Sequence, residues 1–368
     1  MQDLLTEKSP LADLIPKVQA GQRLTREEGI RLYQSNDLLT IGYLADIIRR
    51  RKNGDNVYFI NNRHINPTNV CINRCPLCAF GVDKEDPKSY VMTLDQIEEK
   101  ARESRESNPS EVHIVGGLHP DISFDFQVEM LQRVRKALPD SHIQAFTAVE
   151  IDYFSEQTGM DPLQVLKTLQ EAGLGSLPGG GAEIFSEGVR KKICEKKISG
   201  ERWLEIHGLA HQLGMKTNAT MLYGHIETIE ERVDHLIQLR EQQDRTGGFQ
   251  AFIPLAFHPK NTGLEEYGLA RTTGYDDLKA LAIARLMLDN FDHIKAFWIM
   301  IGPKLAQVSL AFGVDDIDGT VVEEKITHAA GADTGQALTR QELVQMIRAA
   351  GRVPLERDTL YKVIRKEF

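Results

Sequence analysis

Long apolar runs and a secretory leader are both absent from this sequence. A transmembrane helix needs roughly 20 consecutive apolar residues, and no such run occurs in the 368 residues. The first residues, MQDLLTEKSPLADLI, are charged throughout and lack the apolar core of a signal peptide. We therefore expect a cytoplasmic protein that does not enter a membrane.

An excess of basic charge is absent as well. The chain carries 53 Asp and Glu against 44 Lys and Arg, a formal net charge of -9. Proteins that bind nucleic acids or anionic membranes broadly need a positive field. The charge balance therefore disfavours such a general role, although it leaves room for a local basic pocket.

Cysteine is scarce, and its placement is uneven. Of the four cysteines, Cys71, Cys75 and Cys78 lie within one short segment, and Cys194 is far away in sequence. A disulfide framework spreads its cysteines along the chain, so this distribution disfavours one. Thiolates gathered in this way are typical ligands of zinc or of an iron–sulfur cluster.

Short β-branched or aromatic runs alternate with longer amphipathic stretches over most of the chain. The runs predict strands at 57–65, 111–116, 142–148, 174–178, 216–222, 249–256, 293–300 and 317–322. The stretches between them predict helices at 94–107, 124–138, 162–172, 199–213, 228–243 and 276–290. This alternation indicates βαβ units with parallel strands, and the number of repeats favours a closed (β/α)8 barrel.

Further helices are predicted on either side of the barrel. Residues 13–52 and 339–351 have apolar residues at helical spacing, and 324–338 is a loop-like segment rich in Ala, Gly and Thr. The chain therefore divides into an N-terminal helical extension at 1–54, the barrel at 55–322 and a C-terminal extension at 323–368.

Barrel active sites form where the parallel strands end, and polar residues gather at those positions here. His119 follows the second predicted strand, Glu150 the third and Glu183 the fourth. His225 follows the fifth strand and His258 the sixth. The sequence thus predicts one polar face at the carboxyl ends of the strands.

The loop after the first predicted strand carries Cys71, Cys75 and Cys78 in a C-x3-C-x2-C pattern. One loop can hold three corners of a [4Fe-4S] cubane, and the open fourth iron can chelate a small molecule. This arrangement resembles that of the radical S-adenosylmethionine (radical SAM) enzymes. The alternative is a structural zinc held by the three cysteines and a histidine such as His64. Zinc sites usually use C-x2-C pairs, so the spacing favours the cluster.

Two glycine clusters also lie at strand ends. Gly116-Gly117 ends the second predicted strand and Gly179-Gly180-Gly181 follows the fourth. Glycine lets a backbone approach a ligand closely, while a plain turn or a flexible loop is the alternative. The sequence departs from the usual radical SAM pattern at Leu77, where an aromatic residue normally precedes the third cysteine, and Phe80 is the candidate replacement. It departs again at Leu118, where the glycine pair is normally followed by an acidic residue.

Six strings spread over about residues 55 to 330 resemble those of the aminodeoxyfutalosine synthases, a family of radical SAM enzymes in the futalosine route to menaquinone. The strings are NPTNVCINRCPLCAF, HIVGGLHPD, AFTAVEI, SLPGGGAEIF, NATMLYGHIET and FIPLAFHPKNT. Cyclic dehypoxanthine futalosine synthases and deazaflavin (F420 precursor) synthase components share the cysteine motif and a PGGGAE-like string. Those two groups are the alternative.

The resemblance implies a [4Fe-4S] cluster on the three clustered cysteines and SAM as a co-substrate. It also implies an external one-electron reductant such as flavodoxin or ferredoxin. The candidate SAM contacts are Phe80, Gly116, Gly117, Glu150, Gly179, Gly180, Gly181 and Glu183.

The resemblance further implies that the deoxyadenosyl radical adds to the double bond of 3-[(1-carboxyvinyl)oxy]benzoate. Rearrangement and decarboxylation then give 6-amino-6-deoxyfutalosine. The two carboxylates of this substrate need cationic or donor groups. The candidates are His119, His225, His258 and Arg63, with Lys260 and Arg271 as alternatives.

Overall fold

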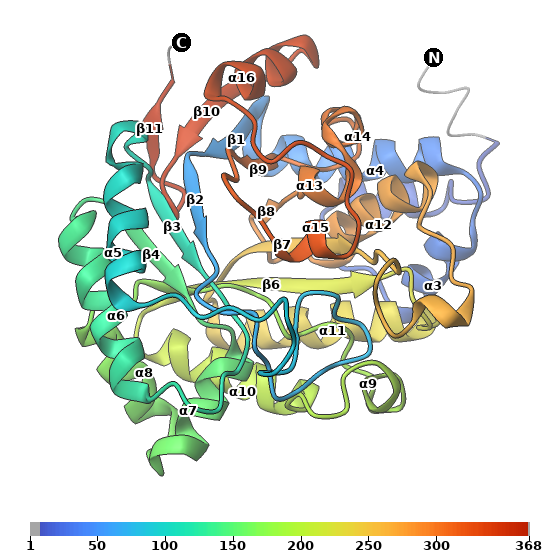
Figure 1. Cartoon of the computed structure of the whole chain (residues 1–368). Coiled ribbons are helices and arrows are strands. Elements are labelled where there is room, and N and C mark those ends of the chain that lie inside the picture. The colour runs from blue at the N-terminus through green and yellow to red at the C-terminus, as the bar shows by residue number, and fades with distance from the viewer. Residues whose placement is uncertain (1–7, 367–368) are drawn as a thin grey trace.

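The computed structural model describes residues 8–366, and parallel strands form its centre (Figure 1). A sheet of seven strands runs in the order β2-β3-β4-β5-β6-β7-β8, and every neighbouring pair is parallel. Its members are β2 (Asn62–Ile65), β3 (Glu111–Ile114), β4 (His142–Ala145), β5 (Ser176–Leu177), β6 (Lys216–Tyr223), β7 (Phe249–Ala256) and β8 (His293–Ile294).

A second sheet of four strands, in the order β11-β10-β1-β9, continues this wall. It contains β1 (Asn56–Ile60), β9 (Asp316–Gly319), β10 (Val353–Arg357) and β11 (Val363–Arg365). Isolated parallel bridges connect Lys295 with Asp316 and Arg63 with Val322, so β9 lies between β8 and β2. The predicted radical SAM (β/α)8 barrel is therefore present in partial form, because single bridges close it in place of a continuous ladder.

Each of the predicted strands has a counterpart, but most differ in extent; the predicted strands 111–116, 174–178 and 317–322 are shortened to β3, β5 and β9. The first predicted strand is broken at Asn61 into β1, which pairs with β9, and β2, which pairs with β3. The predicted strand 142–148 ends at Ala145, because Thr147 caps the next helix. The predicted strand 293–300 ends at Ile294.

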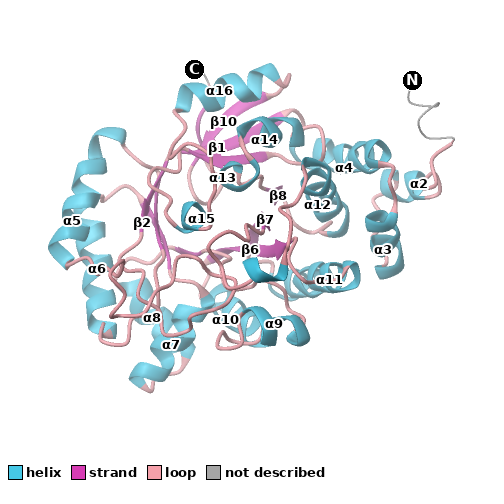
Figure 2. Cartoon of the chain, turned by 45° about the vertical axis from the view of Figure 1, so that its right-hand side comes forward, coloured by secondary structure: helices cyan, strands magenta, loops and turns pink. Residues whose placement is uncertain are grey.

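Helices cover the outside of the strands (Figure 2). The six that the sequence predicts are present as α5 (Leu94–Glu103) with a 3-10 turn after it, α6 (Phe124–Ala137), α8 (Pro162–Glu171), α10 (Gly200–Gln212), α11 (Ile229–Thr246) and α12 (Gly274–Met287). The sequence did not predict α7 (Ala148–Thr158), α9 (Glu187–Ile193), α13 (Trp298–Ile301), α14 (Pro303–Ser309) or α15 (Ile326–Ala329). No helix in residues 8–366 is long and apolar enough to cross a membrane, and the cytoplasmic location stays a prediction.

The two ends of the chain pack on the barrel. The N-terminal helices are α2 (Leu14–Gln19), α3 (Arg26–Gln34) and α4 (Leu38–Asn53). Helix α4 packs on α12, and α3 packs on α11. After the predicted C-terminal helix, α16 (Arg340–Ala349), the chain adds β10 to the free side of β1 in parallel, a pairing that the sequence did not predict.

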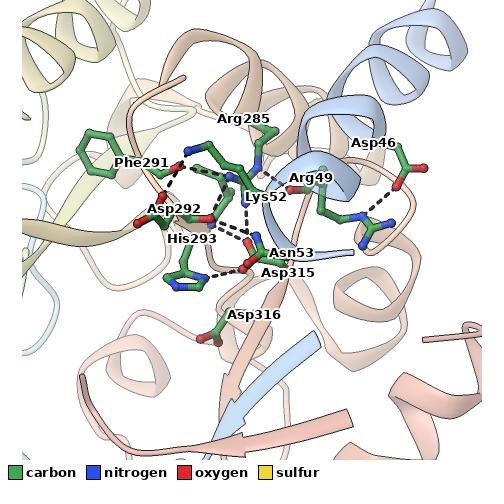
Figure 3. Close-up of polar contacts among 12 residues, drawn as sticks. Asp46, Arg49, Lys52, Asn53, Arg285, Phe291, Asp292, His293, Asp315 and Asp316 are labelled. Carbon is green, nitrogen blue, oxygen red and sulfur yellow. Dashed lines mark hydrogen bonds and ion pairs between the residues drawn. The ribbon is translucent and has the colours of Figure 1, made fainter. Parts of the chain in front are cut away.

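Buried charges connect these extensions to the floor of the barrel, where the strands begin (Figure 3). Arg285 of α12 pairs with Asp315, and His293 Nδ1 contacts the other oxygen of that carboxylate at 2.6 Å. Arg357 of β10 lies 2.6 Å from Asp316. Arg49 of α4, fully buried, donates to Asp46 at 2.8 Å.

Candidate active site

A cavity of about 350 Å³ runs through the barrel interior to the carboxyl ends of the strands. Strands β2, β3, β4, β6, β7 and β9 contribute side chains to its wall. Much of that wall is apolar, including Leu118, Ile253, Leu255, Phe257 and Met300. A cavity of this kind can enclose a ligand and keep water away from it.

The predicted cluster ligands, Cys71, Cys75 and Cys78, all line this cavity. Backbone hydrogen bonds hold their loop: Cys71 N donates to Val82 O at 3.0 Å, and Cys78 N to Cys75 O at 2.9 Å. Gly81 N also donates to the Cys78 sulfur at 3.3 Å. The fold thus presents three thiols from one loop to one enclosed space.

The structure does not assemble the zinc alternative. His64 lies inside the barrel, where its ring stacks on His113 with the centroids 4.7 Å apart. Within residues 8–366, no three Cys, His, Asp or Glu side chains converge closely enough to hold a single ion. A cubane binds each thiolate through a different iron and needs the thiolates further apart, so the donor set fits a cluster better than zinc.

Cys194 lies closer to the cysteine loop than its place in the sequence suggests. It is fully buried and near enough to Cys75 for the charges of the two thiols to interact, although it does not line the cavity. Burial raises the pKa of Cys75 to about 12, and the neighbouring Lys197 opposes that rise. The thiol must therefore lose its proton when a metal centre binds.

The glycine pair at the end of β3 serves close packing. A Cβ atom on Gly117 would lie 2.1 Å from Val70 O and 3.0 Å from Cys71 Cβ. Gly117 N also donates to Thr68 O at 3.0 Å. Glycine at 117 therefore lets the cysteine loop lie directly against the strand end, and both glycines line the cavity.

The triple glycine packs just as tightly. A Cβ atom on Gly179 would lie 2.9 Å from Asn218 O, and one on Gly180 would lie 3.0 Å from Thr147 Cγ2. Gly181 has a φ of +85°, which favours glycine. All three residues line the cavity, so these close approaches define its wall.

Two of the predicted carboxyl groups also line the cavity. Glu150 forms a capping box at the start of α7, and its Oε2 accepts from Thr147 N at 2.6 Å. Burial raises the pKa of Glu150 to about 7. Burial also opposes ionisation of Glu183, but its ion pair with Lys197 outweighs burial and holds the pKa below its ordinary value.

Of the predicted substrate-binding residues, His258 alone lines the cavity. His225 is bound to Glu227 at 2.8 Å and to Leu222 O at 3.1 Å. His119 Nδ1 accepts from Asp121 N, and Arg63 pairs with Glu323 at 3.1 Å.

The remaining candidates are Phe80, Lys260 and Arg271, and only the first lines the cavity. Phe80 lines it and packs edge-on against Tyr90. Lys260 and Arg271 contact Gly331, so they hold a neighbouring segment and do not line the cavity.

His258 has an unpartnered ring nitrogen. Its Nε2 donates to Met300 O at 3.0 Å, since a carbonyl can only accept. Its Nδ1 is buried and has no hydrogen-bond partner. Burial lowers the pKa of His258. The Oδ1 atom of Asn218, also in the cavity wall, is likewise buried and unpartnered.

Sequence reasoning missed Lys295. It lines the cavity, is 7% exposed, and its ammonium group contacts Asp318 Oδ1 at 3.4 Å. A lysine inside the apolar run HIKAFWIM was the available signal, because a charge in a buried segment needs a partner or a ligand.

A segment of the C-terminal extension covers part of the cavity. We name residues 323–334 the strap, because Glu324, Ile326 and Thr327 of this segment line the cavity. Lys325 lies over the ring of Tyr90 at 4.8 Å, and Thr334 donates to Ile299 O at 2.9 Å. The predicted loop at 324–338 therefore contains one short helix, α15, and forms a cover.

Comparison with known proteins identifies the families that share this architecture. The family model of the radical SAM superfamily matches residues 65–239, and that of the CofH/MqnC C-terminal region matches 246–367. The chain is 47% identical to an aminodeoxyfutalosine synthase of Thermus thermophilus, over 96% of both chains. It is 46% identical to one of Streptomyces coelicolor, over 96% of this chain and 94% of the other.

More distant relatives share the length and the fold. A 5-amino-6-(D-ribitylamino)uracil–L-tyrosine 4-hydroxyphenyl transferase of Methanococcoides burtonii is 40% identical over 93% of this chain and 96% of its own. The crystal structure of methylornithine synthase has a TM-score of 0.73 at 20% identity, with 93% and 97% coverage. The hydrogenase maturase HydG of Carboxydothermus hydrogenoformans has a TM-score of 0.75 at 15% identity, with 98% and 83% coverage.

Proposed function

Because this chain belongs to the aminodeoxyfutalosine synthase family of radical SAM enzymes, we propose that it joins the 5'-deoxyadenosyl group of SAM to 3-[(1-carboxyvinyl)oxy]benzoate. The product is 6-amino-6-deoxyfutalosine, a precursor in menaquinone biosynthesis, and methionine is released. The observation that carries this proposal is a loop of three cysteines on the wall of an enclosed barrel cavity, in a chain 47% identical to a synthase.

Cys71, Cys75 and Cys78 would hold the [4Fe-4S] cluster. When bound, that cluster supplies the electron that cleaves the sulfonium of SAM and leaves one iron for the amino acid end of SAM. An external one-electron reductant such as flavodoxin or ferredoxin would reduce the cluster again. The three thiols line one cavity, and Cys194, the fourth cysteine, does not line it, which suits a cluster with an open iron.

The candidate SAM residues form a ring of contacts around the cysteine loop. Gly117 packs against Cys71, and Gly116 donates to Glu150. Glu183 is paired with Lys197, whose charge reaches Cys75. We therefore place SAM between the glycine pair, the triple glycine and these two carboxylates, with Phe80 near the adenine.

The substrate would lie deeper in the barrel, where Lys295 and His258 can hold its carboxylates. Three Lys and Arg side chains line the cavity, and each has a carboxylate partner: Arg74 with Asp83, Lys197 with Glu183 and, at the longer distance of 3.4 Å, Lys295 with Asp318. Lys295 keeps N–H donors for a ligand, because Asp318 is the one partner that the described residues give it. A bound carboxylate would favour protonation of His258, which then donates through Nδ1 as well.

The apolar wall has a role in the reaction. The adenosyl carbon forms a bond to the vinyl CH2 carbon, and the resulting radical attacks the aromatic ring before carboxylate leaves as CO2 or bicarbonate and one electron returns. Leu118, Ile253 and Phe257 keep water and other hydrogen donors away from these radicals. Fixed carboxylates bring the double bond to the adenosyl carbon, so that addition precedes hydrogen abstraction.

An isotope experiment tests this function. The anaerobically reconstituted enzyme is given dithionite, the enolpyruvyl benzoate and SAM labelled at the 5' carbon. We expect most of the label in 6-amino-6-deoxyfutalosine and little in free 5'-deoxyadenosine. Release of all the label as 5'-deoxyadenosine would contradict the proposal. A product from tyrosine with 5-amino-6-(D-ribitylamino)uracil would instead assign the chain to the activity named for its 40% identical relative.

The substrate contact is tested by Lys295→Met, with Lys260→Met as a matched control outside the cavity. A misplacement near 1 Å can cost about a hundredfold in rate, so Lys295→Met should shift label from the product to 5'-deoxyadenosine. SAM cleavage itself should persist in both variants. If Lys295→Met leaves the ratio of labelled product to 5'-deoxyadenosine unchanged, Lys295 does not bind the substrate.

A further inference from the structure

We propose that an acidic one-electron carrier protein docks on the outer side of the cysteine loop, on a surface that we name the donor face. Its exposed residues are Ile72, Pro76, Lys191, Lys192 and Lys196. The inference rests on the proposed function, because an electron must reach the cluster from outside.

The cysteine loop and the end of α9 form one continuous surface. Leu77 N donates to Ile193 O at 3.2 Å, and the Lys196 ammonium group lies 3.5 Å from Ile72 O. Figure 1 shows α9 beside the loops at the open end of the barrel. Ile72 is 41% exposed although it directly follows Cys71, so the surface approaches the cluster ligands closely.

This surface carries unpaired positive charge in an acidic protein. Residues 187–197, EGVRKKICEKK, hold five Lys and Arg against two Glu, whereas the whole chain has a net charge of -9. Two of the five point inward, since Arg190 donates to Ala182 O and Lys197 pairs with Glu183.

The three remaining lysines of that segment are Lys191, Lys192 and Lys196. They are exposed and form no ion pair with any residue from 8 to 366. Exposed lysines without an ion pair also lie elsewhere, such as Lys136 on α6 and Lys167 on α8, but here three of them occur within six residues beside the cysteine loop. The donor face therefore carries three lysines without an ion pair among the described residues, against two exposed glutamates of the same segment, Glu187 and Glu195.

An acidic redox protein suits this surface better than other partners do. Transient redox complexes are small, and charge steers their encounter. Lys196 lies beside the exposed, apolar Ile72, and Lys191 and Lys192 lie on α9, whose end contacts the same loop, so the surface combines positive charge with apolar side chains. The transfer needs no bond change: the carrier is oxidised by one electron and the cluster is reduced by one electron.

The test uses oxidised and reduced flavodoxin, an acidic carrier, with the reconstituted enzyme. The donor-face variant combines Lys191→Glu, Lys192→Glu and Lys196→Glu. The matched control combines Lys136→Glu, Lys167→Glu and Lys362→Glu, which are exposed lysines on α6, α8 and the C-terminal turn and give the same charge change. Binding of oxidised flavodoxin is measured by calorimetry, and cluster reduction by stopped-flow absorbance.

We expect the donor-face variant to bind flavodoxin about tenfold or more weakly, with a matching loss in reduction rate, while the control changes by about twofold or less. Added salt should weaken binding to the unaltered enzyme. Dithionite-driven SAM cleavage should be equal in all three proteins. Equal loss in both variants, or none in the donor-face variant, would overturn the proposal. If dithionite gives SAM cleavage but no adenosylated product, the proposed function fails while the docking result still stands.

Discussion

The two ends of the barrel differ in how their buried polar side chains are engaged, although single atoms without a hydrogen-bond partner occur at both, including Arg49 Nη2 and Arg357 Nη2 at the floor. At the floor, buried charges are paired: Arg285 with Asp315 (Figure 3), and Arg357 with Asp316. In the cavity that leads to the mouth, Asn218 Oδ1 and His258 Nδ1 are buried without a hydrogen-bond partner. A buried polar group without a partner costs about 1–3 kcal/mol. These two atoms also line the cavity, so a bound ligand can complete them.

This difference in pairing indicates that the two ends have different roles. The floor joins three parts of the chain, because Arg49 comes from α4, Arg285 from α12 and Arg357 from β10. Substitutions at the floor should lower the stability of the whole protein. Damage at the mouth should remove ligands and leave the fold in place.

The largest expected effect is the loss of the cluster in Cys75→Ala. The variant should lose most of its iron and sulfide and all SAM cleavage, because two thiols from the loop cannot hold the cubane. Iron and sulfide analysis and the visible absorption of the reconstituted protein measure this. The apoprotein should keep its unfolding midpoint.

Cys194→Ala is the matched control, since that thiol is buried beside Cys75 but does not line the cavity. It should keep both the cluster and SAM cleavage. Loss of the cluster in this control would show that the fourth iron is not open.

At the floor, Arg285→Ala should destabilise the whole protein. Removing one partner of a buried ion pair costs roughly 3–5 kcal/mol, because the other charge stays buried. Denaturant unfolding of the apoprotein checks this, with Lys52→Ala as the control. Asp292, the partner of Lys52, is 77% exposed, so that loss should be about 1 kcal/mol or less. Equal losses of unfolding free energy in the two variants would show that the buried ion pair at the floor contributes no more than an exposed one.

The sequence predicted the features whose pattern lies in consecutive residues. The cysteine spacing singled out a loop that does line the cavity, and strand and helix periodicity located the barrel units. The floor pairs could not be predicted, because Arg285 and Asp315 meet only after distant helices and strands pack. Helix α9 was missed as well, since it has too few residues for a clear periodicity. The unpartnered atoms of His258 and Asn218 depend on side-chain geometry that no pattern encodes.

At the mouth, the charge of Glu150 should control SAM binding. Burial raises the pKa of Glu150 to about 7, so the group is neutral below that pH and anionic above it. Affinity for SAM, whose sulfonium is cationic at every pH, should therefore rise between about pH 6 and pH 8. Calorimetry on the reconstituted enzyme measures this, and Glu150→Gln should lack the rise. The exposed Glu156→Gln on the same helix should keep it, and a rise that survives in Glu150→Gln would exclude this carboxyl as its source.

The smallest expected effect concerns the strap, which covers the mouth and owes part of its closure to one charge. The hydrogen bond from His328 to Glu324 raises the pKa of the histidine to about 9. Its ordinary value is about 6.5. A folded pKa above the unfolded one gives stability that is complete below about pH 6.5 and is lost as the pH rises through about 9. The strap should therefore open more often at pH 10 than at pH 7.5.

Cleavage within residues 323–334 by subtilisin, normalised at each pH to a short peptide substrate, measures this opening. We expect faster cleavage at the higher pH in the unaltered protein. His328→Gln should be cleaved at a similar rate at both values, because it carries no titrating group. A pH effect that persists in His328→Gln would show that another group closes the strap.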